Sequence, residues 1–153
     1  MPQRTERARP LDWEWLGRRR YGEVHAAQLA RRAQIIAGQA PEVLWLLEHE
    51  PVVTVGRRPA PGTPDATTLA GHGIDLHHTE RGGLATWHGP GQLVLYALVD
   101  LVARGLGVRG LVSALEDGVI NTLAGLGLPA TRRCGFPGVW VLSGGGRVVS
   151  SNP

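Results

Sequence analysis

Two short apolar runs separated by a proline constrain the fold of this chain more than any other feature. Residues 43–47 read Val-Leu-Trp-Leu-Leu, and residues 52–55 form a second run that ends at Gly56. A continuous apolar run of this length predicts a strand that is buried on both faces of a sheet. Pro51 lies between the runs and breaks the pattern. We therefore expect two consecutive strands here.

Helical periodicity is present on both sides of these runs. In residues 21–38 the apolar or small side chains of one stripe are Val24, Ala27, Ala30, Ala33 and Ile36, and Gly38 with Pro41 marks the end. A second stretch ends near Gly127, with its apolar positions at Val112, Leu115, Val119, Leu123 and Leu126. Each stretch predicts one amphipathic helix.

The remaining apolar segments predict further strands. Residues 84–87 and 92–99 are joined by His-Gly-Pro-Gly, which predicts a β-hairpin, and residues 74–76 predict a short strand. Residues 138–142 predict a strand, with the start of a return strand at residues 147–151. Residues 57–73 are rich in Pro, Gly and Thr and predict a loop. The fold class is therefore α+β in a single domain, with a mixed sheet and flanking helices.

Composition excludes several kinds of chemistry. All 16 basic residues are arginine, so Schiff-base and P-loop lysines are excluded, because a guanidinium cannot act as an amine nucleophile. The one cysteine, Cys134, excludes an internal disulfide. The six histidines lack the paired spacing of a structural zinc site. We expect no metal and no cofactor.

The positive charge is concentrated at the N-terminal end. Residues 1–32 hold eight arginines against four acidic residues, whereas the other 121 residues hold eight against nine. We expect an Arg-rich polar leader at 1–19 and a nearly neutral domain at 20–153, with no nucleic-acid partner, because a nucleic-acid domain carries a basic stripe on its body. No signal-peptide core is present and the longest apolar stretch is far below the roughly 20 residues of a membrane span. We expect a cytoplasmic protein with no membrane partner.

The segment from Arg81 to Gln92 is the main candidate for chemistry. Its two glycines follow an arginine, let the backbone approach a ligand closely and expose N–H groups, and His88 lies at a turn. The same residues also fit an ordinary structural role, with the glycines as turn residues and Trp87 in the core. Short motifs alone do not decide between these interpretations.

The longer string RGGLATWHGPGQLVLYALVDL resembles the signature of the octanoyltransferases of lipoate biosynthesis. Residues 44–56, the helix with Glu116 and residues 137–141 match other parts of that family. The resemblance implies a fold like that of the biotin and lipoate protein ligases. It also implies transfer of an octanoyl group from acyl carrier protein, through a cysteine acyl-enzyme, to a lysine of the lipoyl domains of 2-oxoacid dehydrogenases and of the glycine cleavage H protein. The residues implied to line the acyl pocket are Arg81, Gly82, Gly83, Leu84, Ala85, Thr86, Trp87 and His88.

The chain departs from the family at its C-terminal end. Arg147 stands where the family has the lysine that activates the thiol, and the nucleophile of the family, in a Pro-Cys-Gly turn, is expected beyond residue 153. We therefore expect a domain without its C-terminal third, no catalytic residue within this chain and no turnover. Cys134 precedes the matching strand and is interpreted as an incidental thiol, although Arg132 and Arg133 could lower its pKa.

Two other interpretations remain open. One is a ligase-like enzyme that uses ATP, which is disfavoured because such ligases rely on a lysine. The other is a remnant that binds acyl chains or acyl carrier protein without turnover. His49 lies between two acidic residues, so its pKa could be raised, or it could cap a strand end at the surface; the resemblance makes a role in the pocket plausible.

Overall fold

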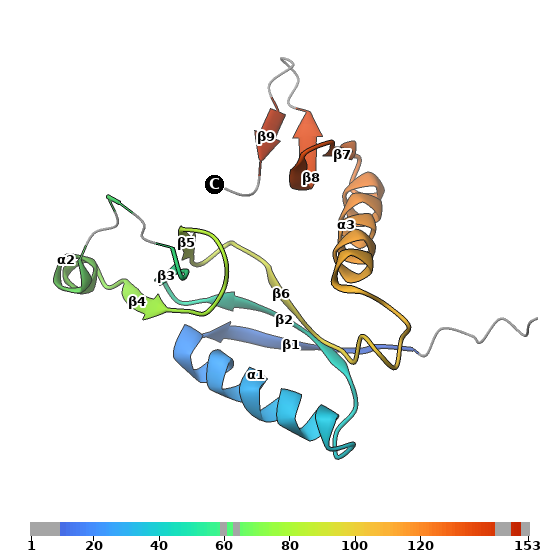
Figure 1. Cartoon of the computed structure of the whole chain (residues 1–153). Helices are drawn as coiled ribbons and strands as arrows, with labels where there is room; N and C mark the ends of the chain where they lie inside the picture. The colour runs from blue at the N-terminus through green and yellow to red at the C-terminus, as the bar shows by residue number, and fades with distance from the viewer. Residues whose placement is uncertain (1–9, 59–60, 63–64, 143–147, 151–153) are drawn as a thin grey trace, which may run out of the picture. The chain divides into compact units, whose positions relative to one another are not determined.

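The computed structural model describes residues 10–58, 61–62, 65–142 and 148–150, which divide into two compact units, Met1–Asp100 and Leu101–Pro153. Figure 1 shows the elements of each unit. Both units combine helices with sheets, and the sheets of the first unit contain parallel and antiparallel pairs. The expected α+β class with mixed sheets is therefore confirmed. No helix in the described residues is both long and apolar enough to cross a membrane.

The first unit contains two three-stranded sheets. Its elements in chain order are β1 (Asp12–Arg19), α1 (Tyr21–Ile36), β2 (Val43–His49), β3 (Val52–Val55), α2 (Ala66–Gly71), β4 (Asp75–His78), β5 (Ala85–His88) and β6 (Val94–Leu98). One sheet has the order β1-β2-β6 and the other β4-β3-β5. The two consecutive strands expected on either side of Pro51 are present, and each belongs to a different sheet.

The expected hairpin between β5 and β6 is wrong. β5 pairs with β3, with Val52 opposite His88, and β6 pairs with β2, with Leu47 opposite Val94. Residues 89–93 therefore carry the chain from one sheet to the other, across from the break that Pro51 makes between β2 and β3. Both pairs are antiparallel. Strands β2 and β3 therefore run along one side of a long two-stranded ribbon, and β5 and β6 run along the other. The ribbon is interrupted at the same level on both sides, between β2 and β3 and between β5 and β6. We call this level the sheet junction.

Helix α1 covers one face of β2. Val43, Trp45 and Leu47 of β2 are buried together with Val24 of the helix, and the full burial of one such side chain contributes about 1.5–3 kcal/mol. The alternate residues of β2 are only half-buried, so the expected burial on both faces is not seen. The helix is confirmed, but its expected alanine stripe is not the inner face. The residues turned inward are Tyr21, Val24, Gln28, Arg31 and Ile35.

The long side chains of α1 explain this difference. The guanidinium of Arg31 lies over the Trp45 ring, 5.7 Å from its centroid, and donates to the carbonyl of Pro41 at 3.4 Å. An arginine can cover apolar surface with its stem while its charged end stays near water, whereas alanine covers little. The length of the side chains, and not only their hydrophobicity, therefore determines which face of α1 lies against the sheet.

Two elements of the first unit were not expected from the sequence. Residues 12–19, part of the expected leader, form β1, which pairs in parallel with β2 at the sheet edge. Glu14 accepts a hydrogen bond of 3.1 Å from the Trp45 indole N–H, which ties the strand to the core. Its charged residues are typical of an edge strand, which explains why they resembled a leader. In the expected loop 57–73, Asp65 caps the short helix α2 by accepting from the backbone N–H of Thr68 at 2.9 Å.

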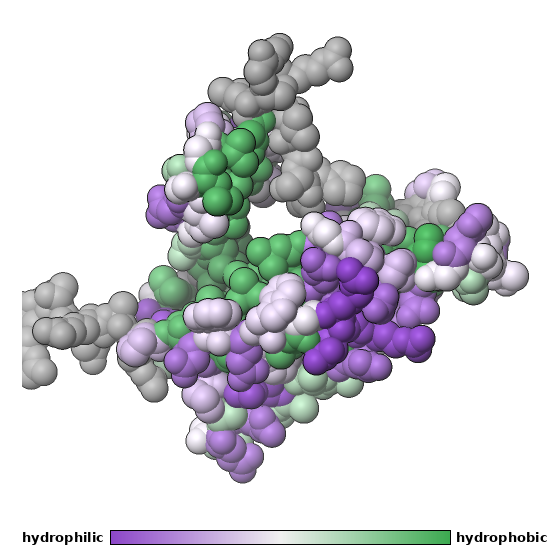
Figure 2. Space-filling model, turned by 180° about the vertical axis from the view of Figure 1, so that it is seen from behind, coloured by the Kyte–Doolittle hydropathy of each residue, from purple (hydrophilic) through white to green (hydrophobic). Residues whose placement is uncertain are grey.

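The second unit is smaller and buries less. It consists of α3 (Val108–Gly125), β7 (Ala130–Arg133), β8 (Phe136–Leu142) and β9 (Val148–Ser150), in an antiparallel sheet of order β7-β8-β9. The second helix and the return strand are thereby confirmed. No residue of α3 is buried. Apolar surface on this unit is visible as green atoms in Figure 2, and Leu126 is 71% exposed.

Candidate active site

His49 is the most deeply buried polar residue at the sheet junction. It ends β2 with 0% of its surface exposed. Its Nδ1 lies 3.1 Å from the carbonyl oxygen of Arg19, and its Nε2 lies 2.9 Å from the hydroxyl of Tyr96. A carbonyl can only accept, so Nδ1 carries the hydrogen and Nε2 accepts from the Tyr96 O–H. Both ring nitrogens are thus satisfied by β1 and β6.

Burial lowers the pKa of His49, the hydrogen bond to the Arg19 carbonyl opposes this shift, and the nearby His88 adds to it. The imidazole is therefore held neutral. This corrects the expectation of a raised pKa and of a cap at the surface: the acidic neighbours in sequence, Glu48 and Glu50, do not set its environment. Burial also raises the pKa of Tyr96 to about 12, so its hydroxyl keeps its proton.

Aromatic rings from three elements lie around His49, and a fourth element adds a ring beside one of them. The Tyr21 ring of α1 lies 5.3 Å from the His49 ring and 5.1 Å from that of His77, which comes from β4. The His88 ring of β5 lies edge-on at 6.0 Å, and Tyr96 of β6 at 5.9 Å. We call these five residues the junction cluster. It brings together side chains that are far apart in the sequence because both sheets are interrupted at this level.

The Arg-Gly-Gly loop folds back onto the end of β3. Arg81 donates through Nη2 to the carbonyl of Thr54 at 2.7 Å and to its hydroxyl at 3.0 Å. The Gly56 N–H donates to the Leu84 carbonyl at 2.9 Å. A Cβ on Gly56 would lie 2.5 Å from the Gly83 carbonyl oxygen, so only glycine lets the loop approach this closely. Arg81 thus fixes the loop that precedes β5, and its charge also acts on Tyr21, lowering a pKa that burial raises.

A tight turn follows His88. The Gln92 N–H donates to the Gly89 carbonyl at 3.1 Å, and Gly91 has a φ of 84°. Proline at the second and a positive-φ glycine at the third position are the pattern of a type II turn. A Cβ on Gly89 would meet the Trp87 indole, so a larger residue here would require that side chain to move. The turn returns the Gln92 side chain to His88, where its Oε1 lies 2.6 Å from Nδ1.

The structure divides the expected pocket residues between two faces. Side chains alternate along β5, so His88 and Thr86 share one face while Trp87 and Ala85 share the other. Of these four residues, only His88 has a ring contact with His49. Trp87 is 47% exposed, so its suggested place in the core is wrong, and Leu84 is 50% exposed. That the residues from Arg81 to His88 line an acyl pocket stays a prediction.

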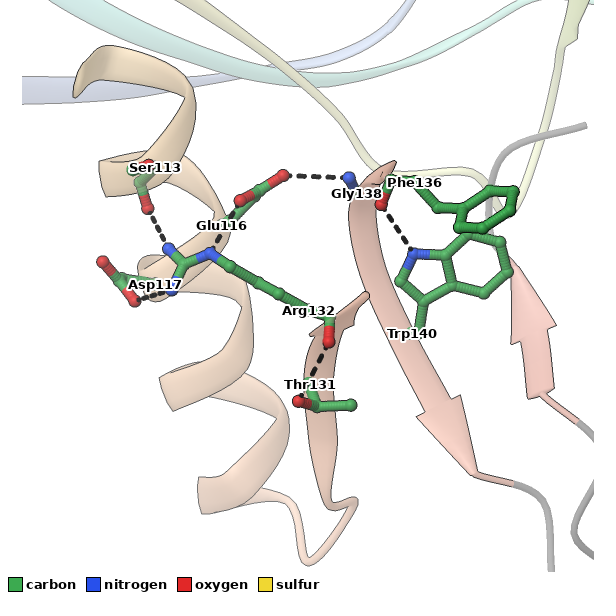
Figure 3. Close-up of polar contacts among 8 residues, drawn as sticks. All are labelled: Ser113, Glu116, Asp117, Thr131, Arg132, Phe136, Gly138 and Trp140. Atoms are coloured by element: carbon green, nitrogen blue, oxygen red, sulfur yellow. Dashed lines mark hydrogen bonds and ion pairs between the residues drawn. The ribbon is translucent and has the colours of Figure 1, made fainter. Parts of the chain in front are cut away.

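The other residues singled out in the sequence belong to the second unit. Arg147 lies outside the described residues. Cys134 is exposed in the turn between β7 and β8. Figure 3 shows Arg132 directed at α3, where it donates through Nε to Glu116 at 2.7 Å and pairs with Asp117 at 2.9 Å. Arg133 lies 5.0 Å from the ring centroids of Phe136 and Trp140. Both guanidinium groups near Cys134 thus have other partners.

A separate cavity of about 340 Å³ lies in the first unit beside the N-terminal end of α1. Its walls contain three arginines and three acidic residues, so its formal charge is balanced; these are Arg18, Arg19, Arg20, Glu23, Glu50 and Asp75. Arg18 also pairs with Glu48 at 3.3 Å. Within the described ranges, no group of three or more His, Cys, Asp or Glu side chains is placed to hold a metal ion.

Three members of the junction cluster are therefore neutral: the His49 imidazole and the two tyrosine hydroxyls. A neutral imidazole accepts a proton at one nitrogen and donates at the other, and the two tyrosines remain protonated. One signal for this cluster is visible in the sequence, because His88 and Tyr96 both lie in the long signature string. Tyr21 and Gly56 carried no signal of their own: their roles depend on contacts between residues that are distant in the sequence.

Comparison with known proteins places the chain in a family. The model of the lipoyl protein ligase A/B catalytic domain matches residues 20–152, so the chain belongs to this family. It is 45% identical over 136 residues to an octanoyltransferase of Cereibacter sphaeroides, which covers 86% of this chain and 59% of the relative. It is 48% identical over 126 residues to that of Thiobacillus denitrificans, covering 82% and 56%. The chain thus spans little more than half the length of these curated relatives.

Solved structures give the same fold. A lipoate-protein ligase A bound with ATP aligns with a TM-score of 0.57 and 21% identity, over 80% of this chain and 49% of that one. A bi-partite lipoate protein ligase from Thermoplasma acidophilum, described with its E2 lipoyl domain, aligns with a TM-score of 0.60 and 19% identity, over 92% and 55%. At this identity the likeness shows the fold alone. The resemblance to the biotin and lipoate ligase fold is therefore confirmed.

Proposed function

We propose that this chain supplies the acyl-binding part of an octanoyltransferase, an enzyme that moves an octanoyl group from acyl carrier protein to a lysine of a lipoyl domain. The observation that carries the proposal is the 41–50% identity to octanoyltransferases over most of the chain. The matched region includes the Arg-Gly-Gly loop and the turn after His88, which the structure builds around the junction cluster. The lipoyl domains of 2-oxoacid dehydrogenases and the glycine cleavage H protein are the acceptors proposed.

The geometry supports acyl transfer more than ATP-dependent ligation. A ligase of this family is expected to rely on a lysine at its adenylate, and the 153 residues contain no lysine. Arg81, the one arginine of the signature, donates hydrogen bonds to Thr54 of β3. A thioester, by contrast, already carries an activated acyl group and needs no nucleotide. We therefore place octanoyl-acyl carrier protein as the donor, without a cofactor.

The 153 residues have no lysine, and their one cysteine lies in an exposed turn. We propose that this polypeptide by itself binds the octanoyl donor and does not turn it over. Residues 81–88 hold the acyl chain in this proposal, with the glycines leaving room for it.

The test is binding by the isotope-labelled chain, followed by NMR. Octanoyl-acyl carrier protein is expected to shift the resonances of residues 81–88 and of the junction cluster, and unacylated carrier protein is the matched control. Saturable shifts with the octanoyl form alone support the proposal. Shifts that require octanoate together with ATP would favour the ligase, and no saturable shift with any of these would contradict the proposed function.

A turnover assay completes the test. The chain, octanoyl-acyl carrier protein and a lipoyl domain are mixed, and the mass of the lipoyl domain is measured. We expect no octanoyl adduct. An adduct that disappears in Cys134→Ala would show that Cys134 is the nucleophile and would overturn its interpretation as an incidental thiol.

A further inference from the structure

In the hydrogen bond between His88 and Gln92, the donor and the acceptor can be assigned. The Oε1 atom of Gln92 lies 2.6 Å from His88 Nδ1, which is a short hydrogen bond. An amide oxygen can only accept, so Nδ1 must carry the hydrogen. In a neutral imidazole this leaves the lone pair on Nε2. The side chain four residues along therefore determines which nitrogen of His88 is basic.

His49 provides an internal comparison. It is the same tautomer, with Nδ1–H donated to the Arg19 carbonyl, but its Nε2 is occupied by the Tyr96 hydroxyl at 2.9 Å. No hydrogen bond to His88 Nε2 is formed within the described residues. Those residues also contain no buried side-chain nitrogen or oxygen without a partner, and His88 is half-buried, so its Nε2 is not completely enclosed by them. The lone pair on Nε2 is therefore used by a hydrogen bond in His49, whereas in His88 it has no partner among the described residues.

We propose that Gln92 is a positioning residue: it holds His88 as the Nδ1–H tautomer, so that Nε2 is presented as an acceptor to a proton donor of the substrate. The donor class is an amine or a thiol, not a carboxylate or phosphate, because a neutral acceptor nitrogen repels an anion. Assigning this donor to the reacting groups of acyl transfer rests on the proposed function, whereas the tautomer does not. On proton transfer the N–H or S–H bond breaks, Nε2 gains the proton, and Nδ1–H stays bonded to Gln92.

The turn explains why this pair can form. Residues 89–92 close a type II turn with Pro90 at its second position, and that turn places residue 92 beside residue 88. An amide in this place fixes the tautomer without adding a charge. A carboxylate would fix the same tautomer and would also stabilise the imidazolium.

The experiment is a long-range ¹H–¹⁵N NMR correlation of the histidine rings in the full chain, at a pH where the rings are neutral. His88 signals are assigned by their loss in His88→Gln. We expect His88 to show a protonated Nδ1 and an unprotonated Nε2. In Gln92→Met, which keeps the length and removes the acceptor, we expect a mixture of tautomers. Gln92→Glu should restore the single tautomer, and Gln34→Met, at an exposed position of α1, should change nothing.

The His49 signals in the same spectrum report whether the junction cluster is intact, so loss of folding in a variant is visible directly. If Gln92→Met disturbs His49, Gln92→Asn replaces it, because its shorter amide cannot reach Nδ1. A wild-type His88 that is protonated at Nε2, or a tautomer that does not change in the variants with an intact His49, would overturn the proposal. These outcomes are independent of octanoyl binding, so they are distinct from failure of the proposed function.

A chemical probe tests the open lone pair. Diethyl pyrocarbonate acylates an unprotonated, accessible imidazole nitrogen and releases ethanol and carbon dioxide. Peptide mass analysis should find His88 modified many times faster than His49. Equal modification of the two rings, or protection of His88, would contradict an accessible Nε2.

Discussion

The first unit places polar groups inside, at the junction of two sheets, whereas the second unit keeps its strongest polar contacts on the surface. His49 and Thr54 are 0% and 1% exposed. By contrast, Arg132, which pairs with Glu116 and Asp117, has 41% of its side chain exposed. Buried hydrogen bonds cannot be exchanged for bonds to water without cost, so they fix tautomers and ring positions. Exposed ion pairs contribute little and are screened by salt.

This difference explains why the candidate chemistry belongs to the first unit. A neutral imidazole with a fixed tautomer requires partners that do not move, and His49 obtains them from α1, β1, β5 and β6. In the second unit, the network of Figure 3 holds the β7–β8 hairpin against α3 through side chains that water can reach.

The largest effect is expected in the core beneath α1. Leu47 is fully buried, so Leu47→Ala should lower the free energy of unfolding of the first unit by about 2–5 kcal/mol. The matched change in the second unit is Leu126→Ala, at a residue that is 71% exposed, and it should cost no more than about 0.5 kcal/mol. Urea unfolding followed by residue-resolved NMR measures both. Equal costs would remove the contrast between the units.

The contact between the Arg-Gly-Gly loop and the end of β3 offers a matched pair of glycines, one on each side. Gly56→Ala forces a Cβ against three carbonyl oxygens of the loop and should destabilise the first unit by about 1–3 kcal/mol. A Cβ on Gly82 meets no atom within 4 Å, so Gly82→Ala should have a much smaller effect. Thermal unfolding compares them. A larger loss in Gly82→Ala would show that the loop does not pack on β3 as described.

The bond between Tyr96 and His49 is next in size. Tyr96→Phe leaves His49 Nε2 buried without a donor and should cost about 1–3 kcal/mol. A double-mutant cycle with His49→Gln isolates the pair, and the two changes should not be additive. Additive effects would mean that the hydroxyl and the imidazole act independently.

The smallest effect is expected in the second unit. Hydrogen bonds from Arg132, and then from the Gly138 N–H, lower the pKa of Glu116. Glu116→Gln removes the charge while it keeps the shape, so we expect faster amide hydrogen exchange at Gly138 and almost no change in global stability. His25→Gln, at an exposed position of the first unit, is a control that should leave Gly138 unaffected. Unchanged exchange at Gly138 in Glu116→Gln would contradict the assigned role.

Most elements could be predicted from the sequence because apolar periodicity reports burial directly. Helix α1 and strand β2 follow from it, but the inner face of the helix does not, since Arg31 covers Trp45 by its reach. Strand β1 was missed because edge strands carry charged residues. The false hairpin at residues 84–99 has a similar origin: the pattern locates the strands and does not reveal which neighbours they pair with.

The candidate site was predicted in part. The signature string led to His88 and to the loop around Arg81. The tautomer of His88 depends on its contact with Gln92. It did not predict that β5 points Trp87 and His88 to opposite faces. For His49 the sequence showed only flanking acidic residues, whereas its pKa depends on burial beneath rings from other elements. Such environments are formed by tertiary contacts, which local patterns do not record.

A titration of His49 shows whether the sheet junction holds this imidazole buried and neutral. Burial holds the His49 pKa below its usual 6.5, so below that pH the unfolded state binds more protons than the folded state. Stability of the first unit should therefore fall as the pH decreases below 6.5, and His49→Gln should weaken that dependence. In an NMR titration we predict that His49 ionises below 6.5. A His49 pKa at or above 6.5 would contradict the account.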